Sequence, residues 1–290
     1  MDLPQLSSII MNLSTLVFVV TSMLVMGLSL SVAQIIAPLR NARLVILALT
    51  ANFILVPLAA YLITISFPIS DGLKIGLILV STAAGAPFLP RLAQIAKGNL
   101  AFSVGLMVLL MVFTIGYMPL VLPRLLQGIS VDAWSIARPL ILLMLIPLVI
   151  GLFIKVRYAE IASAVHPYLA RASTIALVLL IGTGLLAHVK AVLGVFGSGG
   201  IIALLLFLAL AFVFGYLLGG KDASIRSVLG LGTAQRNLSA ALVIAAANFA
   251  DDPDVIVMVL VLGLVDLTAL LITASLLGRR NNAKIKQVRT

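Results

Sequence analysis

The chain has 290 residues, of which 62% are hydrophobic and 10% are charged, and it carries a formal net charge of +10 at pH 7. A soluble domain of this size cannot cover so much apolar surface, so the composition excludes a soluble globular protein and predicts an integral membrane protein. The absence of cysteine also excludes disulfides and thiolate metal ligands.

Stretches of about 20 apolar residues, which match the thickness of the hydrocarbon core, follow one another along the chain. We expect nine transmembrane helices, at residues 13–35, 44–65, 75–96, 100–122, 135–155, 175–193, 201–218, 228–249 and 255–277. The first stretch has no basic flank before it and no evident cleavage site, which favours a retained helix over a signal peptide. The prediction is an all-α, multi-pass membrane protein in which residues 1–290 form one domain.

Most of the positive charge falls on one side of the predicted membrane. If the N-terminus faces outward, 14 of the 19 lysines and arginines lie on the inner side, four lie outside and Arg236 lies within the membrane. This is the positive-inside asymmetry, which favours lipid over nucleic acid as the partner of these charges. We expect a cell membrane, with a bacterial inner membrane as the predicted location. The N-terminus is then outside, and the basic tail at residues 279–290 is cytoplasmic.

The eighth predicted span, residues 228–249, contains an arginine near its middle. Arg236 lies in the polar run 232–237. Arginine is costly in hydrocarbon, so at this depth it indicates a functional site. The polar run also predicts a break in the helix, which is tolerated only where protein or a water-filled cavity replaces the lost hydrogen bonds.

The third predicted span, residues 75–96, also carries helix-breaking residues. It contains Gly85, Pro87 and Pro90, so we expect the helix to unwind there, although a kinked but continuous helix is the alternative. The two interrupted spans are each third in a set of four, spans 1–4 and 6–9. With one spacer span between them, the sets would form inverted repeats whose interrupted helices hold a transporter's binding site.

Polar residues beside the two interruptions are the predicted site. The predicted substrate-binding residues are Thr82, Pro87, Thr233, Arg236 and Asn237. The predicted ion-coupling or polar-core residues are Asn52, Ser103, Gln235 and Asp266. For Asp266 two interpretations stay open: a structural ion pair with Arg236, or a group that takes up and releases a proton during transport. No spacing typical of a catalytic set or metal site occurs in the sequence, so we expect neither an enzyme nor a bound cofactor.

Several stretches together match a known pattern: residues 26–30, Asn52-Phe53 followed by Pro57, residues 86–104, and residues 232–237 followed by an alanine-rich segment. By these motifs the chain resembles the bile acid:sodium symporter family over nearly its whole length. The resemblance implies the nine-helix form of a fold with two inverted repeats. A core domain, about residues 44–122 and 198–278, would hold two crossed, discontinuous helices. A panel domain, about residues 1–36 and 135–193, would move against it.

The sequence also departs from this family at its sodium sites. Where the family has a Ser-Asn pair this chain has Leu89-Pro90, and a family threonine becomes Met107. The shared glutamate of the eighth span falls at Leu231 or Gly232. A hard cation requires several oxygen ligands, and none of these side chains supplies one. The resemblance therefore implies transport but argues against sodium symport by the family mechanism, with a proton as the other candidate coupling ion.

The guanidinium of Arg236 is expected to stand where a cation would, as a fixed positive charge where the two interrupted helices cross. Such a site favours a small organic anion, because arginine offers bidentate geometry to a carboxylate. The predicted function is secondary active transport of small organic anions by alternating access. The alternatives are a sodium-coupled, bile-acid-like symporter with relocated ligands, and a membrane receptor or sensor that uses the same pocket without transport.

Overall fold

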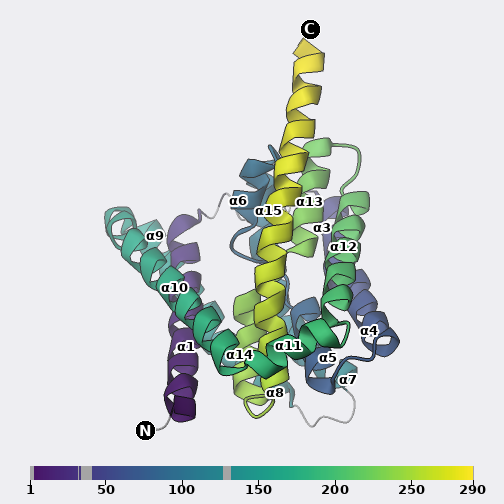
Figure 1. The fold of residues 1–290 in the computed structure, drawn as a ribbon. Coiled ribbons are helices and arrows are strands. Elements are labelled where there is room, and N and C mark those ends of the chain that lie inside the picture. Colours follow the sequence, from purple (N-terminus) through teal and green to yellow (C-terminus); the bar gives the residue numbers. More distant parts are fainter. Residues whose placement is uncertain (1–2, 32, 34–40, 127–131, 290) are drawn as a thin grey trace.

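The computed structural model describes residues 3–31, 33, 41–126 and 132–289, and within these ranges the chain consists of helices and connecting turns, without β-strands (Figure 1). Asp2, Arg40 and the last two residues of the first predicted span lie outside the described residues. The helices in chain order are α1 (Leu3–Ser29), α3 (Ala42–Thr50), η2 (Ala51–Leu55), α4 (Val56–Ser66), α5 (Asp71–Thr82), α6 (Leu89–Ile95), α7 (Leu100–Leu125), α8 (Ala133–Leu140), η3 (Ile141–Leu145), α9 (Ile146–Arg157), α10 (Ala159–Ala187), α11 (Val189–Gly197), α12 (Gly200–Leu218), α13 (Ala223–Ala234), α14 (Leu238–Asn248) and α15 (Pro253–Arg289).

In the described part of the chain, seven continuous helical segments are long and apolar enough to cross a membrane. They are Gln5–Ser29, Ala42–Ser66, Leu100–Leu125, Ala133–Arg157, Ala159–Ala187, Gly200–Leu218 and Pro253–Asn281. These segments confirm an all-helical, multi-pass membrane protein. The third and eighth predicted spans are instead pairs of shorter helices, α5 with α6 and α13 with α14. The total of nine spans and the inverted repeats stay predictions.

Several helix boundaries differ clearly from the expected ones; helix α15, for example, continues to Arg289, whereas its span was expected to end at residue 277. Helix α10 begins at Ala159 rather than near residue 175, so the loop expected around Pro167 is helical. A proline inside a helix removes one backbone hydrogen bond, and α10 continues as a helix on both sides of Pro167. The helix is also held at this end, because His166 Nε2 lies 2.9 Å from Ser29 Oγ at the end of α1. Helix α1 likewise begins at Leu3, ten residues before the predicted start.

Helix α1 packs against α9 and α10, to one side of the other helices (Figure 1). The crossing of α1 with α9 is close because both helices present glycine. A Cβ built on Gly27 would overlap the backbone at Leu148, and one on Gly151 would lie 3.1 Å from the Leu28 amide nitrogen. Small residues at such crossings let two membrane helices approach closely. Any larger side chain at either glycine would separate α1 from α9.

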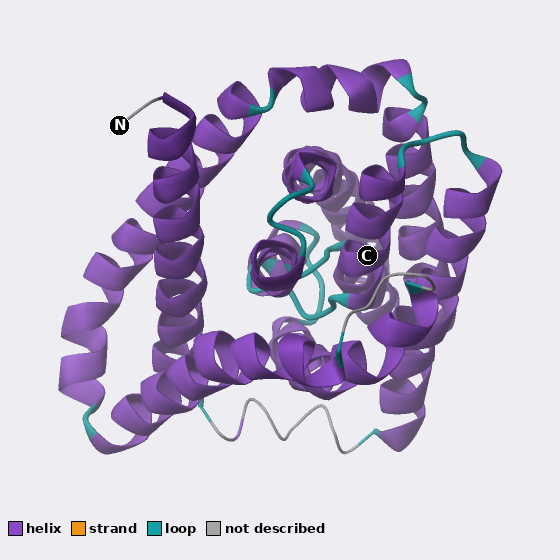
Figure 2. Ribbon diagram, turned by 90° about the horizontal axis from the view of Figure 1, so that it is seen from below, coloured by secondary structure: helices purple, strands orange, loops and turns teal. Residues whose placement is uncertain are grey.

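The broken helices lie deeper in the molecule. Helix α15 packs along α5 and also contacts α6, α13 and α14, while α12 packs on α13 and α4. Viewed along the bundle, loop segments lie near the centre among the helices (Figure 2). Residues 83–86 of the first interruption and 235–237 of the second are buried. This arrangement places both interruptions in the interior of the protein.

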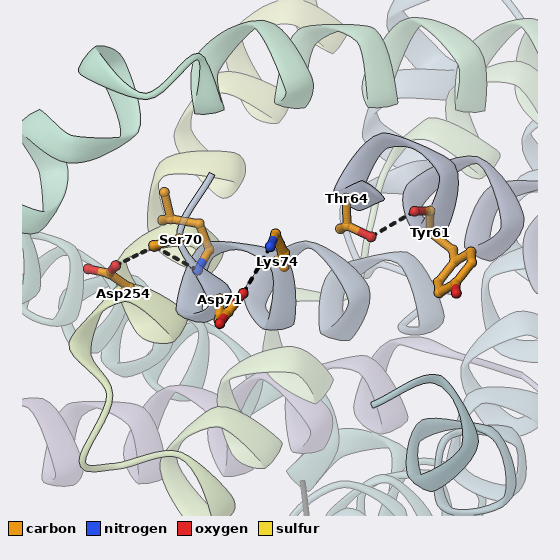
Figure 3. A network of polar contacts seen from close by, with 7 residues as sticks. Tyr61, Thr64, Ser70, Asp71, Lys74 and Asp254 are labelled. Atoms are coloured by element: carbon orange, nitrogen blue, oxygen red, sulfur yellow. Dashed lines mark hydrogen bonds and ion pairs between the residues drawn. The ribbon is translucent and has the colours of Figure 1, made fainter. Parts of the chain in front are cut away.

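One end of α5 is fixed by a polar network with α15 (Figure 3). Ser70 Oγ accepts from the Leu73 amide at the start of α5 and donates to Asp254 Oδ2 at 2.5 Å. The neighbouring pair Lys74 and Asp71 is joined at 2.9 Å. Because this network anchors the start of α5 to the start of α15, it also fixes the depth at which α5 ends.

Candidate functional site

Both predicted interruptions are confirmed. Helix α5 ends at Thr82 and α6 begins at Leu89, and the segment between them includes Gly85 with φ +82°. Helix α13 ends at Ala234, and Gln235 is extended before α14 begins at Leu238. Pro90 lies in the first turn of α6, where a missing amide hydrogen is harmless, so it starts this helix rather than breaking the preceding one.

The two interruptions bind each other through Asn237. Its amide N–H donates to Ala83 O at 2.9 Å, and its Nδ2 donates to Gly85 O at 3.2 Å. Its Oδ1 accepts from the Ala240 amide at 3.2 Å, which caps the start of α14. A single side chain therefore joins segments that are about 150 positions apart in the sequence.

The guanidinium of Arg236 lies among backbone carbonyls of both broken helices. Nε donates to Val80 O at 3.1 Å, and Nη2 donates to Ser81 O at 2.6 Å. Nη1 donates to Thr233 O at 3.0 Å and to Asn52 Oδ1 at 2.9 Å. Arg236 is 1% exposed and is the largest fully buried side chain of the described residues.

The carbonyls that hold Arg236 belong to the last turns of α5 and α13. The last four carbonyls of a helix have no partner within the helix, and together they carry the negative end of its dipole. One guanidinium therefore satisfies and neutralises the ends of two helices at once. The positive charge predicted at this depth is present, and four protein oxygens surround it.

Asn52 connects the second predicted span to this group. It lies in η2, a π-helical turn, and is fully buried. Besides accepting from Arg236, it donates through Nδ2 to Ala48 O at 3.0 Å and to Thr233 Oγ1 at 3.1 Å. Its amide oxygen thus faces the guanidinium, and its amide nitrogen faces α13.

Sequence reasoning missed the π-helical turn, although Pro57 is a signal for it. Proline has no amide hydrogen, so the carbonyl four residues earlier, that of Phe53, loses its α-helical partner. In the structure Tyr117 Oη donates to Phe53 O at 2.6 Å. The ring of Phe53 also packs on that of Tyr117, with centroids 4.7 Å apart. Helix α7 thus supports the turn that presents Asn52.

Thr114 is a second residue that sequence reasoning missed. Its Oγ1 accepts from the Ala84 amide at 2.9 Å and donates to Ala84 O at 3.1 Å. One hydroxyl thus satisfies both backbone groups of a residue in the first interruption. The only sequence signal is a lone threonine within the otherwise apolar residues 104–116.

Replacing Thr114 with valine, which has nearly the same shape, should lower the free energy of unfolding by about 2 kcal/mol, because two buried backbone groups lose their partner. Thr174→Val is the matched control, since Thr174 Oγ1 bonds to Ala170 O on the exposed side of α10. Thermal unfolding in detergent would check this. Equal midpoints for the two variants would contradict the supporting role of Thr114.

The other predicted residues are distributed less tightly. Thr82 ends α5, but its hydroxyl donates back to Ile78 O and Leu79 O of the same helix. Pro87 lies in the first interruption and is exposed. Ser103 donates to Leu100 O at 2.6 Å on α7, and none of its described contacts reaches the Arg236 group.

Asp266 and Gln235 are both buried. Asp266 is 4% exposed and lies on α15, which packs against α13 and α14 on either side of Arg236. The Asp266 and Arg236 side chains do not form a direct ion pair; among the described residues the ion pair within 4.0 Å is that of Lys74 with Asp71. Gln235 is 6% exposed, and its Oε1 has no hydrogen-bond partner among the described residues.

A cavity of about 560 Å³ lies between α1 and α10 on one side and α14 and the start of α15 on the other. Its polar lining comes mainly from hydroxyl, amide and imidazole groups of Ser7, Ser8, Asn12, Thr183 and His188. The remaining lining is largely apolar, which is typical of a small-molecule site. Arg236 does not line this cavity.

A family model described as "Sodium Bile acid symporter family" matches residues 16–194. Among curated proteins, "Probable sodium/metabolite cotransporter BASS3, chloroplastic" of Arabidopsis thaliana is 26% identical over 67% of this chain and 45% of its own length. "Probable sodium/metabolite cotransporter BASS1, chloroplastic" of Arabidopsis thaliana is 24% identical over 81% of this chain and 59% of its own length. "Probable sodium/metabolite cotransporter BASS2, chloroplastic" of Oryza sativa subsp. japonica is 29% identical over 68% of this chain and 47% of its own length. The chain thus spans about half the length of these relatives.

Proposed function

Since the chain belongs to the sodium bile acid symporter family, we propose that it is a secondary active transporter of small organic anions that works by alternating access. The observation that carries this proposal is the guanidinium of Arg236, held by carbonyls from two broken helices in the interior of a multi-pass bundle. Broken helices in this arrangement are typical of transporter binding sites.

Arg236 acts in this proposal as a built-in cation. Backbone carbonyls and an amide oxygen are the ligand types that hold hard cations in proteins, and four of them face this guanidinium. A bound ion can leave, whereas the guanidinium stays attached to the chain. The site therefore keeps its positive charge throughout a transport cycle.

An anionic substrate would bind beside the interruptions, among Thr82, Pro87, Thr233, Arg236 and Asn237. The start of α14, with Asn237 at its cap, adds the partial positive charge of a helix N-terminus. Direct bidentate binding to Arg236 requires the release of hydrogen bonds that the guanidinium makes in this structure. We therefore propose that Arg236 favours the anion chiefly through its charge.

The moving parts are proposed to be a panel, about residues 1–36 and 135–193, and a core, about residues 44–122 and 198–278. The extensive packing of α1 on α9 and α10 supports this division, and α1 meets the proposed core at α14, where Ser22 Oγ lies 3.4 Å from Ser239 Oγ. The cavity between α10 and α14 would then lie between panel and core. Spans 1–4 and 6–9 would be the inverted repeats, with the N-terminus outside the cell and the basic end of α15 at the cytoplasmic surface of the membrane.

Sodium-coupled symport is the second candidate, and the names of the relatives, sodium/metabolite cotransporters, favour it. In that case sodium would use ligands other than the replaced positions, which are Leu89-Pro90, Met107, and Leu231 or Gly232. A receptor that binds the same anion without moving it is the third candidate, and it differs from the other two in one measurable respect. Only a transporter accumulates its ligand across a sealed membrane.

Uptake into proteoliposomes tests the proposal directly. Radiolabelled taurocholate, pantoate and pyruvate would be offered to vesicles containing the purified protein, with and without sodium and pH gradients. Accumulation of one anion above its external concentration is expected. Saturable binding without accumulation would identify a receptor.

The charge of Arg236 is tested in the same vesicles. Arg236→Lys should lower the apparent affinity for the transported anion severalfold, because a lysine ammonium cannot reproduce four fixed hydrogen bonds and its position is less defined. Arg91→Lys is the matched control, since Arg91 is exposed and bonds to Gln94. Unchanged affinity in Arg236→Lys would remove the basis for a fixed positive charge in substrate binding.

A further inference from the structure

Asp266 lies on the face of α15 that is pressed against the second interruption. Gly263, almost one turn earlier on the same face, is so close to α14 that a Cβ would lie 3.0 Å from Leu238 Cδ2. Leu238 is the first residue of α14 and follows Arg236 by two positions, so Asp266 lies on the side of α15 that faces the start of α14. It is the only carboxyl group buried in the described part of the chain.

Two buried acceptor oxygens at this place have no partner. They are Asp266 Oδ1 and Gln235 Oε1, and they are the buried side-chain atoms of the described residues that lack a hydrogen bond. Buried polar groups are nearly always hydrogen-bonded, so each of these atoms requires an explanation. For Asp266, an ionised carboxylate in the protein interior without a full set of partners is costly. Protonation removes this charge, because it converts a carboxylate oxygen into an O–H group.

The surrounding charges leave this carboxyl group without a direct counter-ion. The guanidinium of Arg236 donates to four other oxygens and forms no ion pair with Asp266 within 4.0 Å. Tyr117 on α7 donates its hydroxyl to Phe53 O. The remaining titratable side chains on the helices packed against α15 are exposed or half-buried: Asp71, Lys74, Arg91, Glu160, His166, Tyr168, Arg171, Lys190, Tyr216 and Arg226.

We propose that the Asp266 carboxyl group is a proton-binding site, protonated while it is buried as in this structure, and that its proton is the coupling ion of transport. A proton needs one carboxylate oxygen, whereas sodium requires several oxygen ligands, so a single buried carboxyl group with an unpartnered oxygen suits a proton. When the site opens to water, the O–H bond breaks, the proton passes to water, and the charge of Arg236 stabilises the carboxylate that remains. The coupling half of this inference rests on the proposed transport function, whereas the proton-binding half does not.

Infrared spectroscopy tests the proton-binding half without any substrate. The purified protein at pH 7 should show the C=O stretching band of a protonated carboxyl group, which carboxylates lack. The band should persist in Asp251→Asn, which removes an exposed carboxylate, and disappear in Asp266→Asn. Absence of the band from the unaltered protein, or its persistence in Asp266→Asn, would overturn the proposal. If Asp266→Asn fails to fold, Asp266→Glu must move the band; an unmoved band would overturn the proposal equally.

Proteoliposome uptake tests the coupling half. The measured quantity is the ratio of initial pyruvate uptake with an inward proton gradient to uptake without one, so that each variant is compared with itself. We expect a severalfold ratio for the unaltered protein and for Asp251→Asn, and a ratio of one for Asp266→Asn. A severalfold ratio in Asp266→Asn would overturn coupling through this residue. If none of the three anions accumulates, the proposed function fails, and the infrared band still decides whether Asp266 holds a proton.

Discussion

Replacement of Arg236 with glutamine is expected to lower the free energy of unfolding by roughly 3 kcal/mol or more, the largest effect of any single polar substitution in this protein. The guanidinium satisfies carbonyls at the ends of α5 and α13 and the amide oxygen of Asn52. Glutamine offers one amide group, so most of these buried oxygens would lose their partner. The thermal unfolding midpoint of the purified protein in detergent is the measurement.

Arg226→Gln is the matched control for this prediction. Arg226 is half-buried, donates to Tyr216 O at 3.3 Å and lies 4.3 Å from the centre of the Tyr216 ring. Arg226→Gln therefore removes the hydrogen bond to Tyr216 O and the contact with the Tyr216 ring. It leaves no set of buried carbonyls without a donor. A decrease in midpoint for Arg236→Gln no larger than that for Arg226→Gln would contradict the role assigned to Arg236.

Replacement of Gly85 with alanine is the second large expected effect, a loss of roughly 3 kcal/mol. Gly85 has φ +82°, a conformation that other residues rarely adopt. An added Cβ would overlap the Met111 backbone nitrogen and lie 2.6 Å from Met107 O, so α7 would have to move away. The same residue's carbonyl accepts from Asn237, so the displacement would also weaken the contact between the two interruptions.

Gly116→Ala controls for the loss of a glycine from the same region. Gly116 lies in α7, and a Cβ there would meet no atom within 4 Å. Alanine favours a helix over glycine by about 1 kcal/mol, so this variant should be as stable as the unaltered protein or slightly more stable. Unfolding midpoints that fall equally in both variants would show that the first interruption does not depend on the conformation of Gly85.

The features predicted most accurately from the sequence are those with strong local causes. Apolar length predicts the continuous membrane helices, and the polar run around Arg236 predicts the break before α14. Gly85 and Pro87 predict the other break for the same kind of reason, because glycine and proline each change the local backbone conformation. The contact of Arg236 with Asn52, by contrast, is a property of the packed helices. Sequence reasoning assigned Arg236 to the substrate-binding residues and Asn52 to the ion-coupling or polar-core residues, but it could not pair them.

The features that the sequence did not predict also have a common physical origin. The role predicted for Ser103 stays a prediction; in this structure its hydroxyl donates to Leu100 O of its own helix, and no sequence pattern reveals that hydrogen bond. Thr114 was overlooked because a lone threonine in an apolar helix usually bonds within that helix. The direction of the Arg236 side chain, toward carbonyls instead of toward a cavity, depends on where α14 resumes. That position is determined by the packing of α14 and α15, which periodicity does not encode.

The most direct test of Arg236 as a built-in cation is the unfolding temperature in sodium chloride against choline chloride at equal ionic strength. A ligand that binds only the folded state raises the midpoint. If the guanidinium occupies the place of a cation, the unaltered protein should unfold at the same temperature in both salts. Arg236→Gln, which vacates that place and adds an amide oxygen, should gain a sodium-specific rise. A sodium-specific rise in the unaltered protein, with none in the variant, would contradict the account.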